Sequence, residues 1–242
     1  MIYLRMDDVG ASSKQFEVYS KKRLGNLFFL KRTRRYGAWG PYPELTVEDW
    51  LRIRDCLEEN NAFLTVGVTA SWVEENGSLT PFPEKYEKQA EFLKLLEIEG
   101  RIEIANHGLT HCVVGKHLPR ALSSNRPFHR EFWDYLPIEL HMEHLATSQK
   151  IFMDWLGKAP ETLIPPGNVY SEKTIAAAER YGIKQINSSI AKKNDTSVTV
   201  TDLTNVIAFH DRELVLEGVR WLEARIKDNP NSSSFDLIKN KL

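Results

Sequence analysis

The sequence alternates between short apolar segments and longer amphipathic ones over most of its length. The amphipathic segments place apolar residues at helical spacing, and most end near glycine or asparagine before an aliphatic run begins. Candidate strands lie at 2–6, 63–68, 102–105, 162–165, 183–187 and 206–209, and candidate helices lie between them, with the last at 214–226. Strands separated by helices pair in parallel beneath a helical cover. We therefore expect one α/β domain over residues 1–242, either a (β/α) barrel or an open doubly wound sheet.

Polar residues gather where four of these strands end. Asp7 and Asp8 follow the first strand, residues 106–111 follow the third, residues 165–168 follow the fourth, and His210 with Asp211 closes the last. In parallel α/β folds the carboxyl ends of the strands share one edge of the sheet, so residues distant in sequence meet there. Each group alone has an ordinary explanation as a solvated loop or a helix cap. Their joint position at strand ends favours an enzyme.

The histidines of the third strand end predict a metal site. His107 and His111 are four residues apart, so one helical turn would direct both imidazoles to the same side. With the carboxylate of Asp8 they form a facial triad that leaves positions open for water and substrate. Zinc is the first choice of divalent ion, and nickel, cobalt, iron and manganese also suit these donors. Asp7 then stands outside the triad as a base, and His210 is placed to protonate a departing amine.

In this order, RMDDVG, NHGLTH, LIPPGN and VIAFHD resemble the motifs of the polysaccharide deacetylase family, also known as NodB-homology proteins or carbohydrate esterase family four. The resemblance covers most of the chain. It implies a distorted (β/α) barrel that removes N- or O-acyl groups, usually acetyl, from sugars with a divalent metal. It assigns Asp7 as the catalytic base, His210 as the catalytic acid, and Asp8, His107 and His111 as the metal ligands.

The proline segment departs from the family pattern. Pro165 and Pro166 stand where the family has an arginine-proline motif in its substrate groove, so the resemblance assigns both to substrate binding. The arginine of that motif normally steadies the catalytic base, but its position here holds Ile164. Asp7 therefore needs another basic partner. The candidates are Arg5, Lys192 and Lys193.

The segment at about 12–45 is predicted to be a basic and aromatic insertion after the first strand. Basic residues from Lys14 to Arg35 alternate with aromatic residues that include Trp39. Such a loop beside the site would hold a phosphate-bearing sugar by charge and by stacking, with Trp39 as a substrate-binding residue. A solvated cover with apolar anchors explains the same composition equally well.

Two further histidine-rich or cysteine-containing segments are predicted to be structural. His141 and His144 flank Glu143, and the absence of a nearby carboxylate triad favours a solvated helical face over a second metal site. Cys112 follows a predicted ligand directly and is expected to serve packing, because a hard metal site of this kind rarely needs a thiolate. The long loop at 113–137 is a candidate lid or substrate wall.

Composition excludes some classes of partner and location. The net charge of −1 offers no overall electrostatic reason to expect nucleic acid. Two cysteines are too few for a disulfide framework and are typical of a reducing compartment. The first residues contain neither a secretory signal nor a membrane span, so we expect a cytoplasmic protein.

The expected function is that of a metal-dependent deacylase that hydrolyses the N-acyl group, in the first place N-acetyl, of a sugar. A nucleotide- or lipid-linked amino sugar of surface polysaccharide biosynthesis is the expected substrate. One alternative is a hydrolase of a small non-sugar amide or cyclic amide, since the same metal chemistry is not tied to carbohydrate. Another is a carbohydrate-binding relic that keeps the metal without turnover. Ile164 and the lack of the family's Asp-Trp motif after 183–187 suggest that alternative, and Gly108 in place of the usual Ser or Thr is a further departure from the family pattern.

Overall fold

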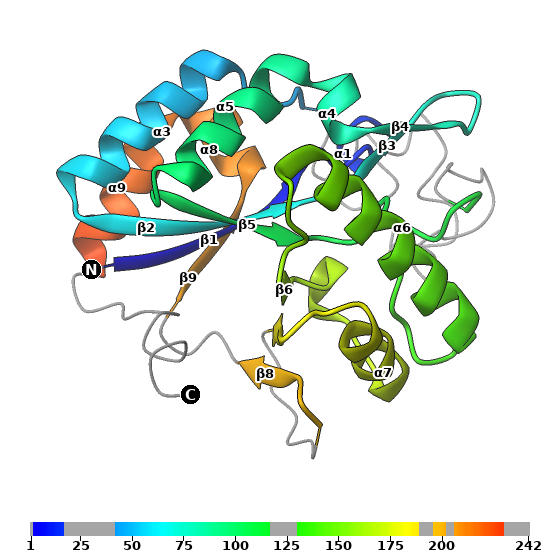
Figure 1. Ribbon diagram of the computed structural model, residues 1–242. Coiled ribbons are helices and arrows are strands. Elements are labelled where there is room, and N and C mark those ends of the chain that lie inside the picture. The colour runs from blue at the N-terminus through cyan, green and yellow to red at the C-terminus, as the bar shows by residue number, and fades with distance from the viewer. Residues whose placement is uncertain (1, 17–41, 117–129, 189–195, 202–205, 230–242) are drawn as a thin grey trace, which may run out of the picture.

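The computed structural model describes residues 2–16, 42–116, 130–188, 196–201 and 206–229 of the 242-residue chain. Seven strands form one parallel sheet in the order β8-β7-β6-β5-β2-β1-β9, and the sheet curls into a half-barrel (Figure 1). The strands are β1 (Ile2–Val9), β2 (Ala62–Val68), β5 (Ile102–Asn106), β6 (Thr162–Leu163), β7 (Gln185–Asn187), β8 (Thr199–Thr201) and β9 (Ile207–His210). The predicted α/β class and its distorted barrel form are confirmed.

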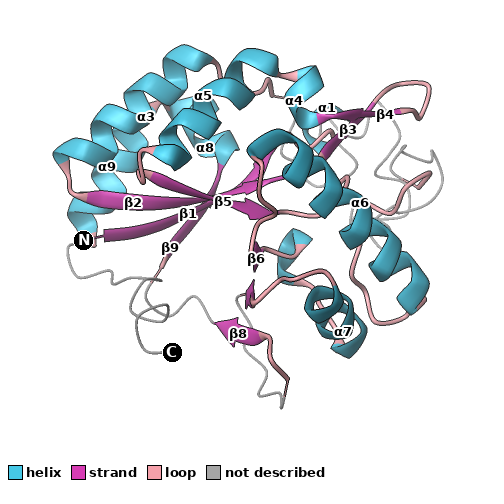
Figure 2. Cartoon of the chain, in the orientation of Figure 1, coloured by secondary structure: helices cyan, strands magenta, loops and turns pink. Residues whose placement is uncertain are grey.

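Helices cover the convex side of this sheet, as Figure 2 shows in cyan beside the magenta strands. They are α3 (Val47–Glu59), α5 (Glu87–Ile98), α6 (Ile138–Leu156), α7 (Glu172–Arg180), α8 (Asp211–Glu217) and α9 (Val219–Asp228). Shorter elements are α1 (Ser13–Phe16), α4 (Phe82–Lys85), the 3-10 turn η2 (Pro166–Asn168) and the antiparallel pair β3 (Ser71–Val73) and β4 (Leu79–Pro81). None of the described helices is long and apolar enough to cross a membrane.

Local signals explain where several helices begin and end. The Thr46 hydroxyl accepts a hydrogen bond from the backbone N–H of Asp49 at 3.2 Å, and the Asp49 carboxylate accepts one from the N–H of Thr46 at 3.0 Å. This capping box starts α3 at the predicted place. Gly157 ends α6 with a φ of 77°, a left-handed conformation that glycine adopts without strain. The prediction of one late helix is wrong, because Gly218 separates α8 from α9.

The two faces of β1 have different environments because successive side chains of a strand point to opposite sides. Leu4 and Met6 are fully buried in the main hydrophobic core, which β1 shares with β2, β5 and helices α3, α5 and α9. Arg5 and Asp7 therefore share the other face. A second core lies between β6, β7 and helices α6 and α7. The two cores stabilise the half-barrel, and the polar face of β1 contributes to the candidate site.

The end of β1 differs from expectation. Asp7 and Asp8 were expected in a loop, but β1 continues to Val9. Its pairing with β2 shifts register between Met6 and Val9, which places both carboxylates in an irregular strand end. The hairpin β3–β4 and strand β8 were not predicted. Of the insertion expected at 12–45, residues 17–41 lie outside the described residues, and Trp39 is among them.

Candidate active site

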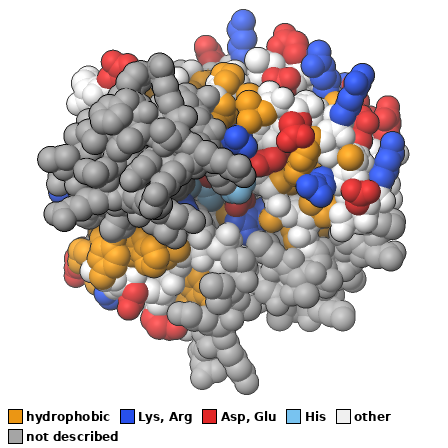
Figure 3. All heavy atoms as spheres, turned by 180° about the vertical axis from the view of Figure 1, so that it is seen from behind, with side chains coloured by type: hydrophobic (Ala, Val, Ile, Leu, Met, Phe, Trp, Pro, Cys, Tyr) orange, Lys and Arg blue, Asp and Glu red, His pale blue; other side chains and the backbone are white. Residues whose placement is uncertain are grey.

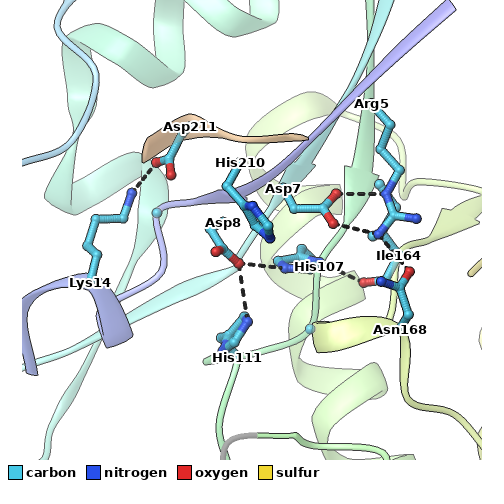
Figure 4. A network of polar contacts seen from close by, with 12 residues as sticks. Arg5, Asp7, Asp8, Lys14, His107, His111, Ile164, Asn168, His210 and Asp211 are labelled. Carbon is cyan, nitrogen blue, oxygen red and sulfur yellow. Dashed lines mark hydrogen bonds and ion pairs between the residues drawn. The ribbon is translucent and has the colours of Figure 1, made fainter. Parts of the chain in front are cut away.

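Three predicted metal ligands meet at the carboxyl ends of β1 and β5. Asp8 Oδ1 lies 3.1 Å from His107 Nε2 and 3.2 Å from His111 Nε2 (Figure 4). One donor atom from each of these buried residues lies within 4.8 Å of the other two. Ligands bound to one ion at about 2.0–2.1 Å lie about 3 Å apart, so this spacing fits a divalent metal ion. Burial lowers the pKa of His111 despite the opposing effect of Asp8, which keeps its imidazole neutral and able to bind a metal at neutral pH.

His107 is oriented by the segment that follows β6. Its Nδ1 lies 2.7 Å from the carbonyl oxygen of Ile164. Because a carbonyl only accepts, Nδ1 carries the proton and Nε2 keeps its lone pair for a cation. Ile164 thus serves the site through its backbone, while its side chain is buried.

Backbone strain is concentrated at this site. Within the described residues, the non-glycine residues with positive φ are Asp8 (73°), Asn61 (47°), His111 (66°) and Asn168 (60°). All except Asn61 belong to the site. Such conformations cost roughly 1–3 kcal/mol each, and they persist where the surroundings impose them. The fold therefore holds the two ligands Asp8 and His111 in place before any ion binds.

The segment between the two histidines is not the helical turn that their spacing predicted. Residues 107–111 are irregular, and Gly108 has a φ of 85°. The reason is that side-chain oxygens accept the amides that a helix would use internally. Asn106 Oδ1 accepts from the N–H of Gly108 at 2.8 Å, and the Glu131 carboxylate accepts from those of Leu109 and Thr110. The imidazoles converge through this turn instead.

Asp7 lies outside the ligand group and is paired with Arg5. Arg5 Nε donates to Asp7 Oδ1 at 2.7 Å, and Nη2 donates to Oδ2 at 2.5 Å. The Arg5 side chain is 0% exposed and that of Asp7 only 10%. Arg5 Nη1 also donates to Asn187 Oδ1 at 2.9 Å, and Nη2 donates to Asn168 Oδ1 at 3.1 Å. The end of β7 and the turn η2, both far away in sequence, therefore fix the guanidinium that holds Asp7.

Arg5 is thus the partner of Asp7 among the three candidates, because residues two apart on a strand share a face. Lys192 and Lys193 lie outside the described residues. The asparagine partners were not predicted. The only available signal was Asn168 in the proline segment, which ends a strand as the catalytic candidates do.

His210 reaches the site from β9, directly beside Asp7 in the paired strands. Its imidazole is 36% exposed, and Nδ1 lies 3.7 Å from Glu213 Oε2. Burial by itself would lower the pKa of His210, but Glu213, Asp8 and Asp7 together raise it to about 9. The imidazole is therefore protonated at neutral pH, as a proton donor must be.

We expect Glu213→Gln to lower the pKa of His210 by about 1 pH unit, because removal of a facing carboxylate stabilises the neutral ring. NMR titration of the ring protons in metal-free protein measures this directly. The pKa of about 9 in the folded protein exceeds the ordinary histidine pKa of 6.5, so the stability contributed by His210 is complete below pH 6.5 and is lost as the pH rises through 9. An unchanged titration in Glu213→Gln would mean that the two aspartates alone raise the pKa.

Lys14 anchors the start of the predicted insertion beneath the site. Its ammonium group donates to Asp211 and, at 2.8 Å, to Glu44, and the Tyr42 hydroxyl donates to Asp211 at 2.9 Å. Burial opposes the charge of Lys14, but Asp211 and Glu44 outweigh it and raise its pKa. Lys14 is therefore part of a buried ion-pair network next to His210, and not of a solvated basic cover.

The structure also corrects the prediction for the segment with His141 and His144. Only Glu143 faces solvent, whereas both histidines are buried. His141 contacts the Thr174 hydroxyl at 3.1 Å, and His144 Nδ1 lies 3.2 Å from the Glu131 carboxylate. The prediction of a solvated face is wrong because α6 packs against α7 and against the segment that contains Glu131.

The proline segment lines the site with its backbone and with Asn168. Pro165 and Pro166 are buried, and the exposed Gly167 leaves room for the Arg130 guanidinium, since a Cβ there would lie 1.9 Å from Arg130 Cζ. Figure 3 shows histidine atoms recessed near the centre of one face, beside acidic and basic side chains. Cys112 is fully buried and its pKa is raised by burial, in keeping with a packing role.

Residues 40–186, more than half of the chain, match the family model described as Polysaccharide deacetylase. The chain belongs to the polysaccharide deacetylase family. The matched range includes His107, His111 and the proline segment, and it begins after Asp8 and ends before His210. Asp8 on β1 therefore lies outside the matched range, but it contacts both histidines within that range.

Solved structures with a similar fold include members of this family and one other enzyme. A family 4 acetyl xylan esterase from Clostridium thermocellum, in complex with cobalt, is 13% identical, with 77% of this chain and 80% of that one covered and a TM-score of 0.45. A family 4 carbohydrate esterase from Streptomyces lividans, in complex with acetate, is 13% identical, with 74% and 82% covered and a TM-score of 0.43.

A 4-alpha-glucanotransferase from Thermococcus litoralis is 14% identical, with 80% of this chain and 36% of that one covered and a TM-score of 0.48. No curated protein matches the sequence. Because the TM-scores of these three structures lie below 0.5, membership of the polysaccharide deacetylase family rests on the family match.

Proposed function

We propose that this polysaccharide deacetylase family member is a metal-dependent deacetylase that hydrolyses the N-acetyl, or another N-acyl, group of a sugar. The observation that carries the proposal is the approach of Asp8 Oδ1 to both imidazoles, at 3.1 and 3.2 Å. Asp8, His107 and His111 would hold one divalent ion. Zinc is the first choice, and nickel, cobalt, iron or manganese suit the same donors.

A divalent ion bound there supplies Lewis acidity, which polarises the acyl carbonyl and makes water a stronger acid. Asp7 is positioned to take the proton of the attacking water. Arg5 donates to both of its carboxylate oxygens, so the orientation of the carboxylate is defined. His210, protonated at neutral pH, donates a proton to the departing amine. Base and acid come from neighbouring strands, and therefore face the same reacting group.

The proposed substrate is an acylated amino sugar, nucleotide- or lipid-linked, and the proposed setting is cytoplasmic biosynthesis of a surface polysaccharide. The membership of the family supports the sugar, and the composition of the sequence supports the location. The structure gives less support to a carbohydrate-binding relic than the sequence alone did. Arg5 supplies a basic partner for Asp7, and the lack of one at Ile164 was one of the two reasons to consider an inactive site.

Metal removal and a substrate screen test the proposal together. We expect the purified protein to contain one equivalent of a divalent metal, to lose acetate release from acetylated amino sugars after chelation, and to regain it with zinc. Elemental analysis and an acetate assay measure both. Turnover confined to small non-sugar amides would favour the alternative hydrolase, and bound metal without any turnover would favour the relic.

A further inference from the structure

The loop that carries the two ligand histidines is organised around one buried carboxylate, Glu131. This side chain is 0% exposed and lies within the long loop that was expected at 113–137. Its Oε2 accepts from the N–H of Leu109 at 2.8 Å, and its Oε1 accepts from the N–H of Thr110 at 2.5 Å. The Thr110 hydroxyl lies 3.3 Å from Oε1 and donates to the carbonyl oxygen of Cys112 at 2.5 Å. Two backbone donors from the middle of the ligand loop thus converge on one carboxylate.

Gly108 shows how closely Glu131 fits this loop. A Cβ added at Gly108 would lie 2.6 Å from Glu131 Oε2 and 2.9 Å from its Cδ. Real Cβ atoms essentially never approach another atom so closely, and the φ of 85° also disfavours any side chain. A side chain at position 108 would therefore adopt a strained backbone conformation and would displace the Glu131 carboxylate from its present position. Gly108 allows the carboxylate to approach the backbone of the loop closely.

His144 lies beside Glu131 in the interior of the protein. Its Nδ1 lies 3.2 Å from Glu131 Oε2, and α6 presents it from the middle of a long helix. Burial by itself would raise the pKa of Glu131, but His144 and the two backbone N–H groups outweigh burial and lower it. Glu131 is therefore ionised, and it accepts stronger hydrogen bonds from the loop than a neutral group would.

We propose that Glu131, which lies beside His144, is the positioning residue that sets the His107–His111 loop to bind a divalent ion. The part of the inference that concerns the metal ion rests on the proposed function. The part that concerns the conformation of the loop does not depend on it. Removal of a group that orients metal ligands through hydrogen bonds commonly lowers metal affinity about 10–100-fold. Here a single carboxylate on the amides between two ligands takes that role.

Glu131→Gln tests the proposal, with His141→Gln as the matched control. The glutamine keeps the size of the side chain, but its NH₂ group cannot accept from an amide, so one of the Leu109 and Thr110 amides loses its partner. His141 is a buried histidine one turn earlier on α6 that contacts Thr174 and Trp133. The control thus removes a buried imidazole from α6, the helix that also carries His144, and leaves the contacts of Glu131 with the ligand loop intact.

Two measurements are needed. In metal-free protein we expect the Leu109 and Thr110 amides to exchange at least about 10-fold faster in Glu131→Gln, as the loss of a buried hydrogen bond predicts. In competition with a chromophoric chelator, we expect zinc affinity to fall about 10–100-fold in this variant. His141→Gln is expected to leave both quantities unchanged.

Wild-type exchange rates and affinity in Glu131→Gln would overturn the proposal, and so would equal losses in both variants, which would indicate only a general loosening of α6. If the wild-type protein binds no divalent metal, the proposed function fails, and the amide exchange still decides whether Glu131 holds the loop.

Discussion

Asp7→Asn is expected to reduce acetate release about 10²–10⁴-fold while metal affinity stays at the wild-type value. The carboxamide cannot accept a proton from water, whereas Asp8, His107 and His111 keep every donor atom of the proposed metal site. We expect the variant to be less stable as well, because the buried Arg5 cation loses its counter-charge, although it keeps its bonds to Asn168 and Asn187. Steady-state kinetics and a metal competition assay give the two readouts.

Asp8→Asn is the matched comparison, one residue further along the same strand. It replaces the carboxylate that lies near both imidazoles with a neutral carboxamide, a weaker ligand for a divalent ion, so we expect it to lose metal affinity as well as turnover. The adjacent carboxylates would then be separated by their phenotypes. Loss of metal from Asp7→Asn, or turnover in that variant close to wild type, would contradict the division of roles between base and ligand.

Arg5→Met is expected to lower the free energy of unfolding by about 3–5 kcal/mol. The Asp7 carboxylate would remain nearly buried without its cation, and the oxygens of Asn168 and Asn187 would lose their donor. Urea denaturation measures the change. Lys150→Met is the control, because its ion pair with Asp154 has side chains 74% and 64% exposed and should contribute at most about 1 kcal/mol.

The double variant Arg5→Met with Asp7→Leu provides a second measurement of the free energy of unfolding if the single variant fails to fold. Replacement of both members of a buried ion pair by apolar residues is often nearly neutral, so we expect it to recover most of the lost stability. Additive losses in the double variant would show that the cost at Arg5 comes from packing and not from a charge left without its partner.

Local regularities in the sequence were sufficient for the class of fold and for the edge of the sheet that holds the site. The Thr46 cap, the Gly157 stop and the apolar spacing of the helices are read within a few residues, and the structure agrees with them. The face shared by Arg5 and Asp7 also follows from their spacing on one strand. Even here the spacing of His107 and His111 misled, because a helical turn was expected and Glu131 and Asn106 impose another path.

Which polar side chains are buried, and with what partner, was decided only by the tertiary structure. His144 has the same neighbours in sequence whether it faces water or a carboxylate, and the packing of α6 selects the second. Likewise, Asn187 reaches Arg5 across 182 positions of the chain, and Lys14 reaches Asp211 across 197. A repeating apolar pattern is written into every turn of a helix or strand, so sequence alone reveals it. A buried polar partnership depends on where distant segments dock, and no local pattern carries that information.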